Sequence, residues 1–256
     1  MTFKTKESRL LLVLGSFFVA NAILSEFIGV KLFSVEETLG FSKFDINLFG
    51  VPHLSFVMSA GVLTWPIIFI MTDIINEYFG VQQVRFLSIL TSILIAFAFL
   101  VVWGSMHLTA ADFWVHQTIN GEDVNMNNAF AGIFGQGMWI IVGSITAFII
   151  GQMVDVVIFH RIKKFTGDRS LWLRATGSTL VSQFVDSFVV IFIAFYINPQ
   201  YHYSWQQVFA IGLVGYTYKF IVAILMTPIL YLVHRIIDGY LGKDLAHKLM
   251  DEAAKG

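Results

Sequence analysis

The sequence has no cysteine and few charged residues. Charged side chains make up 13% of its 256 residues, against about a quarter in a typical soluble domain. The lack of cysteine excludes disulfides, thiolate metal sites and cysteine nucleophiles. The net charge of −1 provides no basic field that would attract a nucleic acid. This number of charged side chains is too small to cover a water-exposed surface. The composition therefore argues against a soluble globular enzyme.

Long apolar segments take the place of the missing charges. Hydrophobic residues make up 57% of the chain, 26 of them Phe, and the mean hydropathy is +0.75. No charged residue lies between Arg85 and Asp112, or between Asp123 and Asp155. A helix needs about 20 mostly apolar residues to cross a bilayer, and continuous rather than alternating apolar runs favour helices over barrel strands. We predict an all-α membrane protein with one domain and six transmembrane helices, at roughly 10–32, 54–75, 85–107, 130–155, 174–197 and 207–233.

The basic residues predict the orientation. All Lys and Arg residues except Lys31, Lys43 and Lys219 fall in the N-terminal arm, the second and fourth connections, and the C-terminal tail. By the positive-inside rule these segments are cytoplasmic. Both termini are therefore predicted to lie in the cytoplasm, in agreement with an even number of spans.

The start of the chain has a second interpretation. Lys4, Lys6 and Arg9 precede an apolar stretch that ends in Ala20-Asn21-Ala22, a pattern that also fits a cleavable signal peptide. The apolar character continues through Val30. We therefore expect the first segment to remain as a span.

Polar residues inside the predicted spans are the candidates for function. An ionisable group in the bilayer costs from about 2.5 kcal/mol upward, so it needs a partner or a task. Asp73, Asn76 and Glu77 stand at i, i+3 and i+4, on one face of a helix. The alternative is a cytoplasmic helix end whose charges reach water. Glu26, near the outer end of the first span, is expected to extend to the interface.

Two later spans carry a matching pattern. Gly151-Gln152-Met153-Val154-Asp155 and Ser182-Gln183-Phe184-Val185-Asp186 each place Gln and Asp three residues apart, after a small residue. Internal repeats of this kind are typical of transporters. Lys219, in the sixth span, either neutralises one of these aspartates or contacts the substrate. The predicted substrate-binding residues are Asp73, Asn76, Glu77, Gln152, Asp155, Gln183, Asp186 and Lys219.

The known motifs of enzymes and cofactor proteins are missing from the sequence. The seven His residues are scattered, and there is no HExxH pair, no GxSxG elbow and no Walker or Gly-rich nucleotide loop. We therefore expect no metal, no cofactor and no ATP-driven motor in this chain. Three functions stay open: a transporter, a substrate-binding subunit that needs an external ATPase, and an intramembrane enzyme that uses paired carboxylates.

The run TDIINEYFG from Thr72 to Gly80, together with the two Gln-x-x-Asp pairs, resembles the queuosine precursor transporter family. This family is also grouped with the vitamin uptake transporters of bacterial inner membranes. The resemblance implies a multi-pass inner-membrane protein that imports 7-cyano-7-deazaguanine, 7-aminomethyl-7-deazaguanine or both, which are precursors of the tRNA base queuosine.

The polar residues suit such a ligand. A guanine-like edge presents adjacent N–H donors that a carboxylate accepts in pairs, and Gln or Asn amides satisfy the other polar atoms. Phe184, Tyr216 or Tyr218 is available to stack on the ring, and an excess of acidic residues would suit the aminomethyl cation. The expected partners are thus the deazapurine and membrane lipid, with no nucleic acid. Small-residue spacings such as Ser16/Ala20 also permit the helix contacts of a homo-oligomer.

Overall fold

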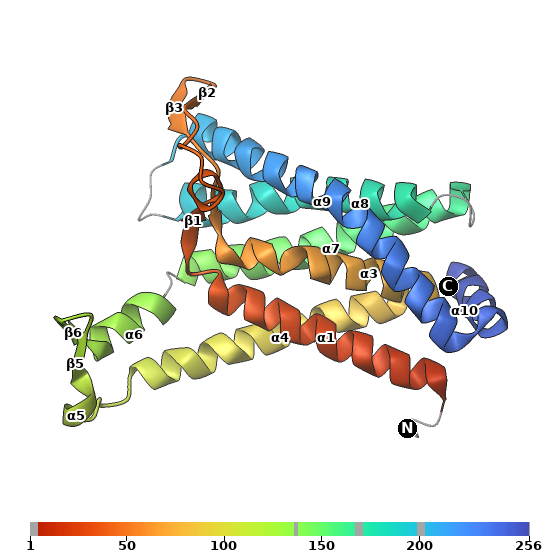
Figure 1. The fold of residues 1–256 in the computed structure, drawn as a ribbon, viewed down its shortest axis with the longest axis horizontal. Coiled ribbons are helices and arrows are strands. Elements are labelled where there is room, and N and C mark those ends of the chain that lie inside the picture. Colours follow the sequence, from red (N-terminus) through yellow and green to blue (C-terminus); the bar gives the residue numbers. More distant parts are fainter. Residues whose placement is uncertain (1–4, 136–137, 167–170, 199–202, 256) are drawn as a thin grey trace.

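The computed structural model describes residues 5–135, 138–166, 171–198 and 203–255. Its long helices run side by side along one axis (Figure 1). Around the central α3 (Trp65–Phe79) lie α1 (Lys6–Ile28), α4 (Val81–Met106), α7 (Met138–Thr166), α8 (Leu171–Ile191) and α9 (Trp205–Leu241). The helix α8 continues as the π-helical turn η3 (Phe192–Ile197).

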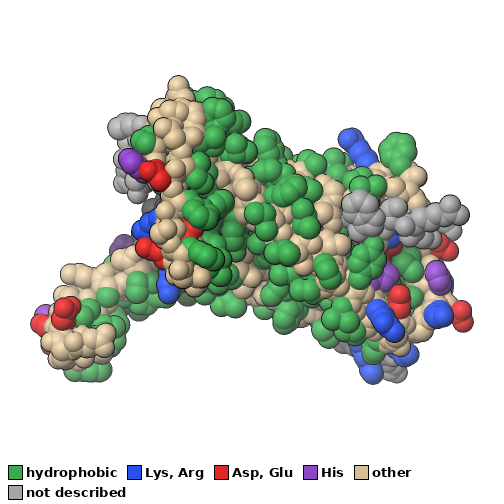
Figure 2. Space-filling view, turned by 45° about the horizontal axis from the view of Figure 1, so that its top comes forward, with side chains coloured by type: hydrophobic (Ala, Val, Ile, Leu, Met, Phe, Trp, Pro, Cys, Tyr) green, Lys and Arg blue, Asp and Glu red, His purple; other side chains and the backbone are tan. Residues whose placement is uncertain are grey.

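The surface has the character of a membrane protein. Among the described residues, five helices are long and apolar enough to cross a bilayer. Apolar side chains cover the middle of the molecule, and charged side chains gather toward its two ends (Figure 2). The five candidate spans are Lys6–Ile28, Val81–Met106, Val142–Thr166, Leu173–Ile197 and Trp205–Leu241.

The predicted second span, 54–75, is wrong in its bounds. The helix α3 begins only at Trp65 and has 15 residues, which gives a length of about 22 Å, less than the roughly 30 Å of a bilayer core. The residues before it form strands β3 (Val51–Leu54) and β4 (Val57–Ser59) and the 3₁₀ turn η1 (Ala60–Leu63). Pro66, in the first turn of α3, favours a helix start at this position.

Irregular backbone within a membrane is tolerated where it packs against protein. This segment packs against α1. The Ser25 hydroxyl donates to the Gly61 carbonyl at 2.9 Å, and the Ser59 hydroxyl donates to the Gly29 carbonyl at 2.7 Å. A Cβ on Gly61 would lie 2.7 Å from the Ser25 carbonyl oxygen. Glycine at 61 therefore permits the close approach of η1 to α1.

The all-α prediction also missed three two-stranded antiparallel sheets among the described residues. They pair β1 (Leu32–Ser34) with β4, β2 (Ile46–Leu48) with β3, and β5 (His116–Ile119) with β6 (Glu122–Asn125). Asn120 and Gly121, which join β5 to β6, have φ values of 52° and 86°. Positive φ at two successive residues is the geometry that an Asn-Gly hairpin turn adopts. The signal for this hairpin was therefore present in the sequence.

Short helices complete the connections. They are α2 (Val35–Thr38), α5 (Asp112–Val115), α6 (Met126–Phe134) and, after the last span, α10 (Lys243–Lys255). The predicted fourth span, 130–155, is divided between α6 and α7, and α7 extends to Thr166. Asp155 consequently lies within a helix rather than at its end.

Glu36, in α2, holds the segment that precedes α3. Its carboxylate accepts a hydrogen bond from the Phe56 N–H at 2.8 Å and another from the Ser34 hydroxyl at 3.1 Å. Desolvation disfavours the charged form of Glu36, but these hydrogen bonds outweigh it and lower the pKa of this carboxyl. The charged carboxylate thus links α2 to the strand region before η1.

The ends of the molecule differ. Both termini and α10 lie at one end, called here the terminal end, and the strands lie at the other, called the sheet end (Figure 1). Termini at one end agree with an even number of crossings. That this end faces the cytoplasm stays a prediction.

We expect Gly61→Ala to lower the stability of the protein by about 1–3 kcal/mol, because the added methyl group would push η1 away from the α1 backbone. The apparent melting temperature of the detergent-purified protein measures the effect. Gly104→Ala, where a Cβ meets nothing within 4 Å, is the matched control and should not lower it. Equal melting temperatures for Gly61→Ala and the wild type would contradict the close-approach account.

Candidate substrate-binding site

A cavity lies between α3, α8 and α9, bounded at one side by Val62 of η1. The cavity and its opening together comprise about 530 Å³ of space free of protein atoms. Trp65, Phe69 and Tyr218 supply its aromatic walls. The polar side chains that line it are Asp73, Thr176, Thr179, Gln183, Lys219 and Thr227.

Two of these side chains have buried atoms without a hydrogen-bond partner among the described residues. They are Asp73 Oδ1, an acceptor, and Gln183 Nε2, a donor. Both residues are 4% exposed. A buried polar atom without a partner costs about 1–3 kcal/mol. A ligand that offers an N–H group and a carbonyl to this cavity would recover that cost.

Lys219 lines the same cavity and forms an ion pair with Asp186 across α8 and α9. Both side chains are partly buried, at 19% and 18% exposure. Asp186 lies against α7 as well, because a Cβ on Gly151 would be 3.5 Å from the Asp186 Cβ. Lys219 therefore neutralises an aspartate, which is one of the two roles that the sequence left open, and it also borders the cavity; its contact with a substrate stays a prediction.

The first Gln-x-x-Asp pair lies behind the cavity, on α7. The Gln152 Oε1 accepts a hydrogen bond from the Thr72 hydroxyl at 3.0 Å, and Asp155 Oδ1 accepts one from Ser182 at 3.2 Å. Neither Gln152 nor Asp155 is among the residues that line the cavity. The two matching pairs in the sequence thus have different surroundings: Gln183 borders the cavity, and Gln152 joins α7 to α3.

Asn76 is buried on α3, and its Nδ2 has no hydrogen-bond partner in the described part of the chain. It also lies outside the cavity lining. Of the eight predicted site residues, the cavity brings together Asp73, Gln183 and Lys219. The other five predicted residues do not line the cavity: Asn76, Glu77, Gln152, Asp155 and Asp186.

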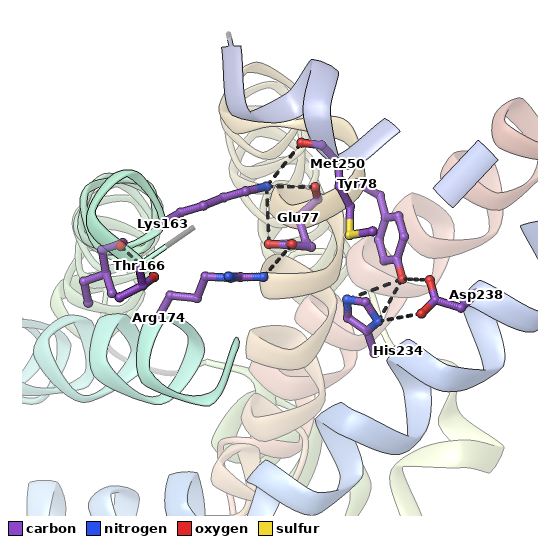
Figure 3. Close-up of polar contacts among 9 residues, drawn as sticks. Glu77, Tyr78, Lys163, Thr166, Arg174, His234, Asp238 and Met250 are labelled. Carbon is purple, nitrogen blue, oxygen red and sulfur yellow. Dashed lines mark hydrogen bonds and ion pairs between the residues drawn. The ribbon is translucent and has the colours of Figure 1, made fainter. Parts of the chain in front are cut away.

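Glu77 occupies a buried ionic cluster (Figure 3). Its carboxylate is 2.6 Å from an Arg174 guanidinium nitrogen and 3.4 Å from Lys163 Nζ. Lys163 also donates to the Glu77 carbonyl at 3.2 Å and to the Met250 carbonyl at 3.5 Å. These contacts join α3, α7, α8 and α10. The alternative of a helix end in water is therefore wrong for Glu77, which is fully buried.

A neighbouring set of contacts joins α3 to α9. The Tyr78 hydroxyl donates to Asp238 Oδ1 at 2.7 Å and lies 3.0 Å from His234 Nδ1 (Figure 3). Asp238 Oδ2 is 3.3 Å from His234 Nδ1. Together with the Glu77 cluster, these contacts fasten α3 to the surrounding helices at the terminal end.

Other predictions need correction. Glu26 does not extend freely to the interface: its carboxylate accepts a hydrogen bond from the Ser144 hydroxyl of α7 at 2.6 Å. Of the three aromatic residues proposed to stack on a ligand, only Tyr218 lines the cavity. Phe184 and Tyr216 pack against each other, with ring centroids 5.3 Å apart. Trp65 and Phe69 also line the cavity, but no sequence signal singles them out, because they lie among many similar aromatics in an apolar run.

The candidate spans indicate a multi-pass membrane protein, and its helix bundle contains a cavity with a few polar side chains in its lining. The profile of the putative vitamin uptake transporter family matches residues 59–233, and the chain belongs to this family. It is therefore a transporter and not an enzyme, which excludes the carboxylate-enzyme alternative.

Three curated relatives confirm the resemblance drawn from Thr72–Gly80 and the Gln-x-x-Asp pairs. A "Probable queuosine precursor transporter" of Bacillus subtilis strain 168 is 31% identical over 199 residues, which is 76% of this chain and 77% of the relative. A protein of the same name from Haemophilus influenzae is 27% identical, over 67% of this chain and 66% of its own. The "Queuosine precursor transporter" of Escherichia coli K12 is 28% identical, over 68% and 71%. No solved structure gives a significant match.

Replacing Glu77 by Gln should destabilise the protein by roughly 3–5 kcal/mol, because Lys163 and Arg174 would lose a buried counter-charge. Thermal unfolding in detergent measures the loss. Glu252→Gln is the matched control, since Glu252 is exposed and 3.9 Å from exposed Lys248, a kind of pair that contributes about 0–1 kcal/mol. If both variants unfold at the same temperature, the Glu77 cluster does not hold α3 in place.

Proposed function

We propose that this chain imports a 7-deazaguanine precursor of queuosine through the cavity between α3, α8 and α9. The unpaired Asp73 Oδ1 and Gln183 Nε2, which belong to residues that line one cavity, carry this proposal. The names of the three relatives supply the substrate class. The bacterial relatives also support a place in the inner membrane, with both termini in the cytoplasm by the distribution of basic residues.

The two unpaired atoms are complementary to the edge of a 7-deazaguanine. That edge carries the N1–H and N2–H donors beside the O6 acceptor. Asp73 would accept from the N–H groups, and the Gln183 amide would donate to O6. A site that leaves polar atoms unpaired without its ligand rejects molecules that lack the complementary groups. This arrangement therefore favours a guanine-like base over an apolar ring of the same size.

The walls of the cavity fit a flat heterocycle. Trp65 and Phe69 of α3 and Tyr218 of α9 are aromatic and line it from two helices. Small-molecule sites commonly have apolar walls with a few polar groups. The lining of this cavity, mostly apolar with Asp73, Gln183 and Lys219 among its polar residues, has this character. Stacking on one of these rings would hold the base while the polar atoms set its orientation.

The other predicted residues act, in this proposal, through the residues that contact the ligand. Thr72, whose hydroxyl donates to Gln152 Oε1 of α7, is next to Asp73. Asp155 holds Ser182, which is next to Gln183. Asp186 holds Lys219. The repeated Gln-x-x-Asp pattern would thus position the binding residues from behind the cavity.

The interpretation as a substrate-binding subunit of an ATP-driven importer shares this cavity and these contacts. Ligand binding by the purified chain does not separate the two functions. Transport by the chain alone does, because the subunit would need its ATPase partner.

Replacing Asp73 by Asn should weaken the binding of 7-cyano-7-deazaguanine by roughly tenfold to a hundredfold, because a neutral amide replaces the charged acceptor. Isothermal titration of the detergent-purified chain measures the Kd, with guanine and an unrelated vitamin as specificity controls. Asp112→Asn, the same substitution at the start of the short helix α5 in the 108–129 loop, should leave the Kd unchanged. Equal Kd values for Asp73→Asn and the wild type would falsify the assignment of this cavity.

A further inference from the structure

Lys219 has hydrogen-bonding capacity beyond its ion pair. An ammonium group has three N–H donors, and among the described residues Asp186 is the one acceptor that Lys219 contacts. Lys219 lines the cavity, whereas Asp186 does not. The donors that Asp186 does not use are therefore available to an acceptor in the cavity.

The positions of the three polar residues give the cavity a direction. Asp73 is eight residues after Trp65, about two turns along α3 toward the terminal end. Gln183 and Asp186 are three residues apart on α8, so they share a face. Lys219 pairs with Asp186 and therefore lies near Gln183, on the side away from the terminal end. Among the cavity-lining residues, Asp73 is the one of α3 nearest the terminal end, and Gln183 is the one of α8 farthest from it. The order along the cavity is therefore Asp73, then Gln183, then Lys219.

A 7-deazaguanine has its polar groups in the same order. The N2 and N1 donors come first, O6 follows, and the substituent on C7 projects beside O6. With the N–H groups at Asp73 and O6 at Gln183, the 7-substituent points toward Lys219. This placement rests on the proposed function.

We propose that Lys219 is the specificity-determining residue of this transporter, and that it makes the cavity select the 7-cyano over the 7-aminomethyl precursor. The nitrile nitrogen is a neutral acceptor and receives a hydrogen bond from the Lys219 ammonium. The aminomethyl group is itself an ammonium at neutral pH, offers no acceptor, and is repelled by the like charge.

The charges around the cavity support this direction of selectivity. The sequence alone suggested an acidic excess that would suit a cation. In the structure Glu77 is paired with Arg174 and Lys163, and Asp186 is paired with Lys219. Asp155 and Glu26 accept hydrogen bonds from Ser182 and Ser144, and neither lines the cavity. The charged side chains that line the cavity are Asp73 and Lys219. Asp73 is assigned to the N–H edge, so the 7-substituent meets the positive charge.

Asp186 makes the proposal sharply testable. If Lys219 loses its charge, Asp186 becomes a carboxylate without a counter-ion at the same place. The cation that best replaces the lost ammonium is then the aminomethyl group of the other precursor. Removing one charge should therefore turn the preference around rather than merely weaken binding.

The experiment is a titration of the detergent-purified full chain with each precursor. The wild type should bind the 7-cyano compound at least about tenfold more tightly than the 7-aminomethyl compound. Lys219→Met should shift the ratio of the two Kd values by roughly tenfold to a hundredfold toward the aminomethyl compound. Lys219→Arg, which keeps the charge and the donors, should retain the wild-type preference. The double variant Lys219→Met/Asp186→Asn should lose the preference for the 7-cyano compound without gaining one for the cation.

The outcomes separate the two proposals. A wild type that binds neither precursor overturns the proposed function, and this inference with it. A wild type that binds both equally, or prefers the aminomethyl compound, overturns this inference and leaves the proposed function standing. If the ratio of the two Kd values in Lys219→Met equals that of the wild type, this inference is likewise overturned and the proposed function stands. Should Lys219→Met fail to fold, the double variant Lys219→Met/Asp186→Asn, which removes both charges of the ion pair, still decides: an unchanged preference for the 7-cyano compound in it overturns this inference.

Discussion

The cost of burying polar groups in a bilayer determines how this structure is organised. Where the chain places a charge inside the bundle, it generally supplies a partner from another helix: Arg174 and Lys163 for Glu77, and Lys219 for Asp186. Some buried atoms have no hydrogen-bond partner in the described part of the chain. Asn76 Nδ2, Gln152 Nε2 and Asp155 Oδ2 belong to residues outside the cavity lining, whereas Asp73 Oδ1 and Gln183 Nε2 belong to residues that line it. The last two are the atoms assigned to the proposed ligand.

The short central helix α3 links stability to the site. Ten of its 15 residues are buried, so protein rather than lipid surrounds it, and the irregular segment before it can lie within the bundle. Its terminal end is fixed by Glu77 and Tyr78. Its other end starts at Trp65 and presents that ring, Phe69 and Asp73 to the cavity. One helix thus carries both the ionic cluster and a wall of the proposed binding site.

Hydropathy located five of the long helices, because long uncharged runs need no tertiary information, but α7 continues to Thr166 and α9 to Leu241, past the predicted ends at 155 and 233. Hydropathy did not predict the start of α3, because the sequence is continuously apolar from residue 54 onward. The features that fix this start are Pro66 in the first turn and the contact of Gly61 with α1. In the sequence, Lys163 and Arg174 indicated only the orientation of the chain. In the structure they pair with Glu77, which is 86 and 97 residues away along the chain. The sequence also could not distinguish Gln152 from Gln183, because similar local patterns acquire different neighbours only when α3, α7, α8 and α9 pack together.

Uptake by liposomes that contain only this chain tests the central claim most directly. The account predicts that 7-cyano-7-deazaguanine accumulates in liposomes with the wild-type protein. It also predicts that Gln183→Leu, which removes the amide donor from the cavity, abolishes uptake while the protein remains folded and inserted. Equal uptake by the two proteins would contradict the assignment of the cavity. A folded wild-type protein that binds the compound but does not transport it alone would instead indicate a subunit of a larger importer.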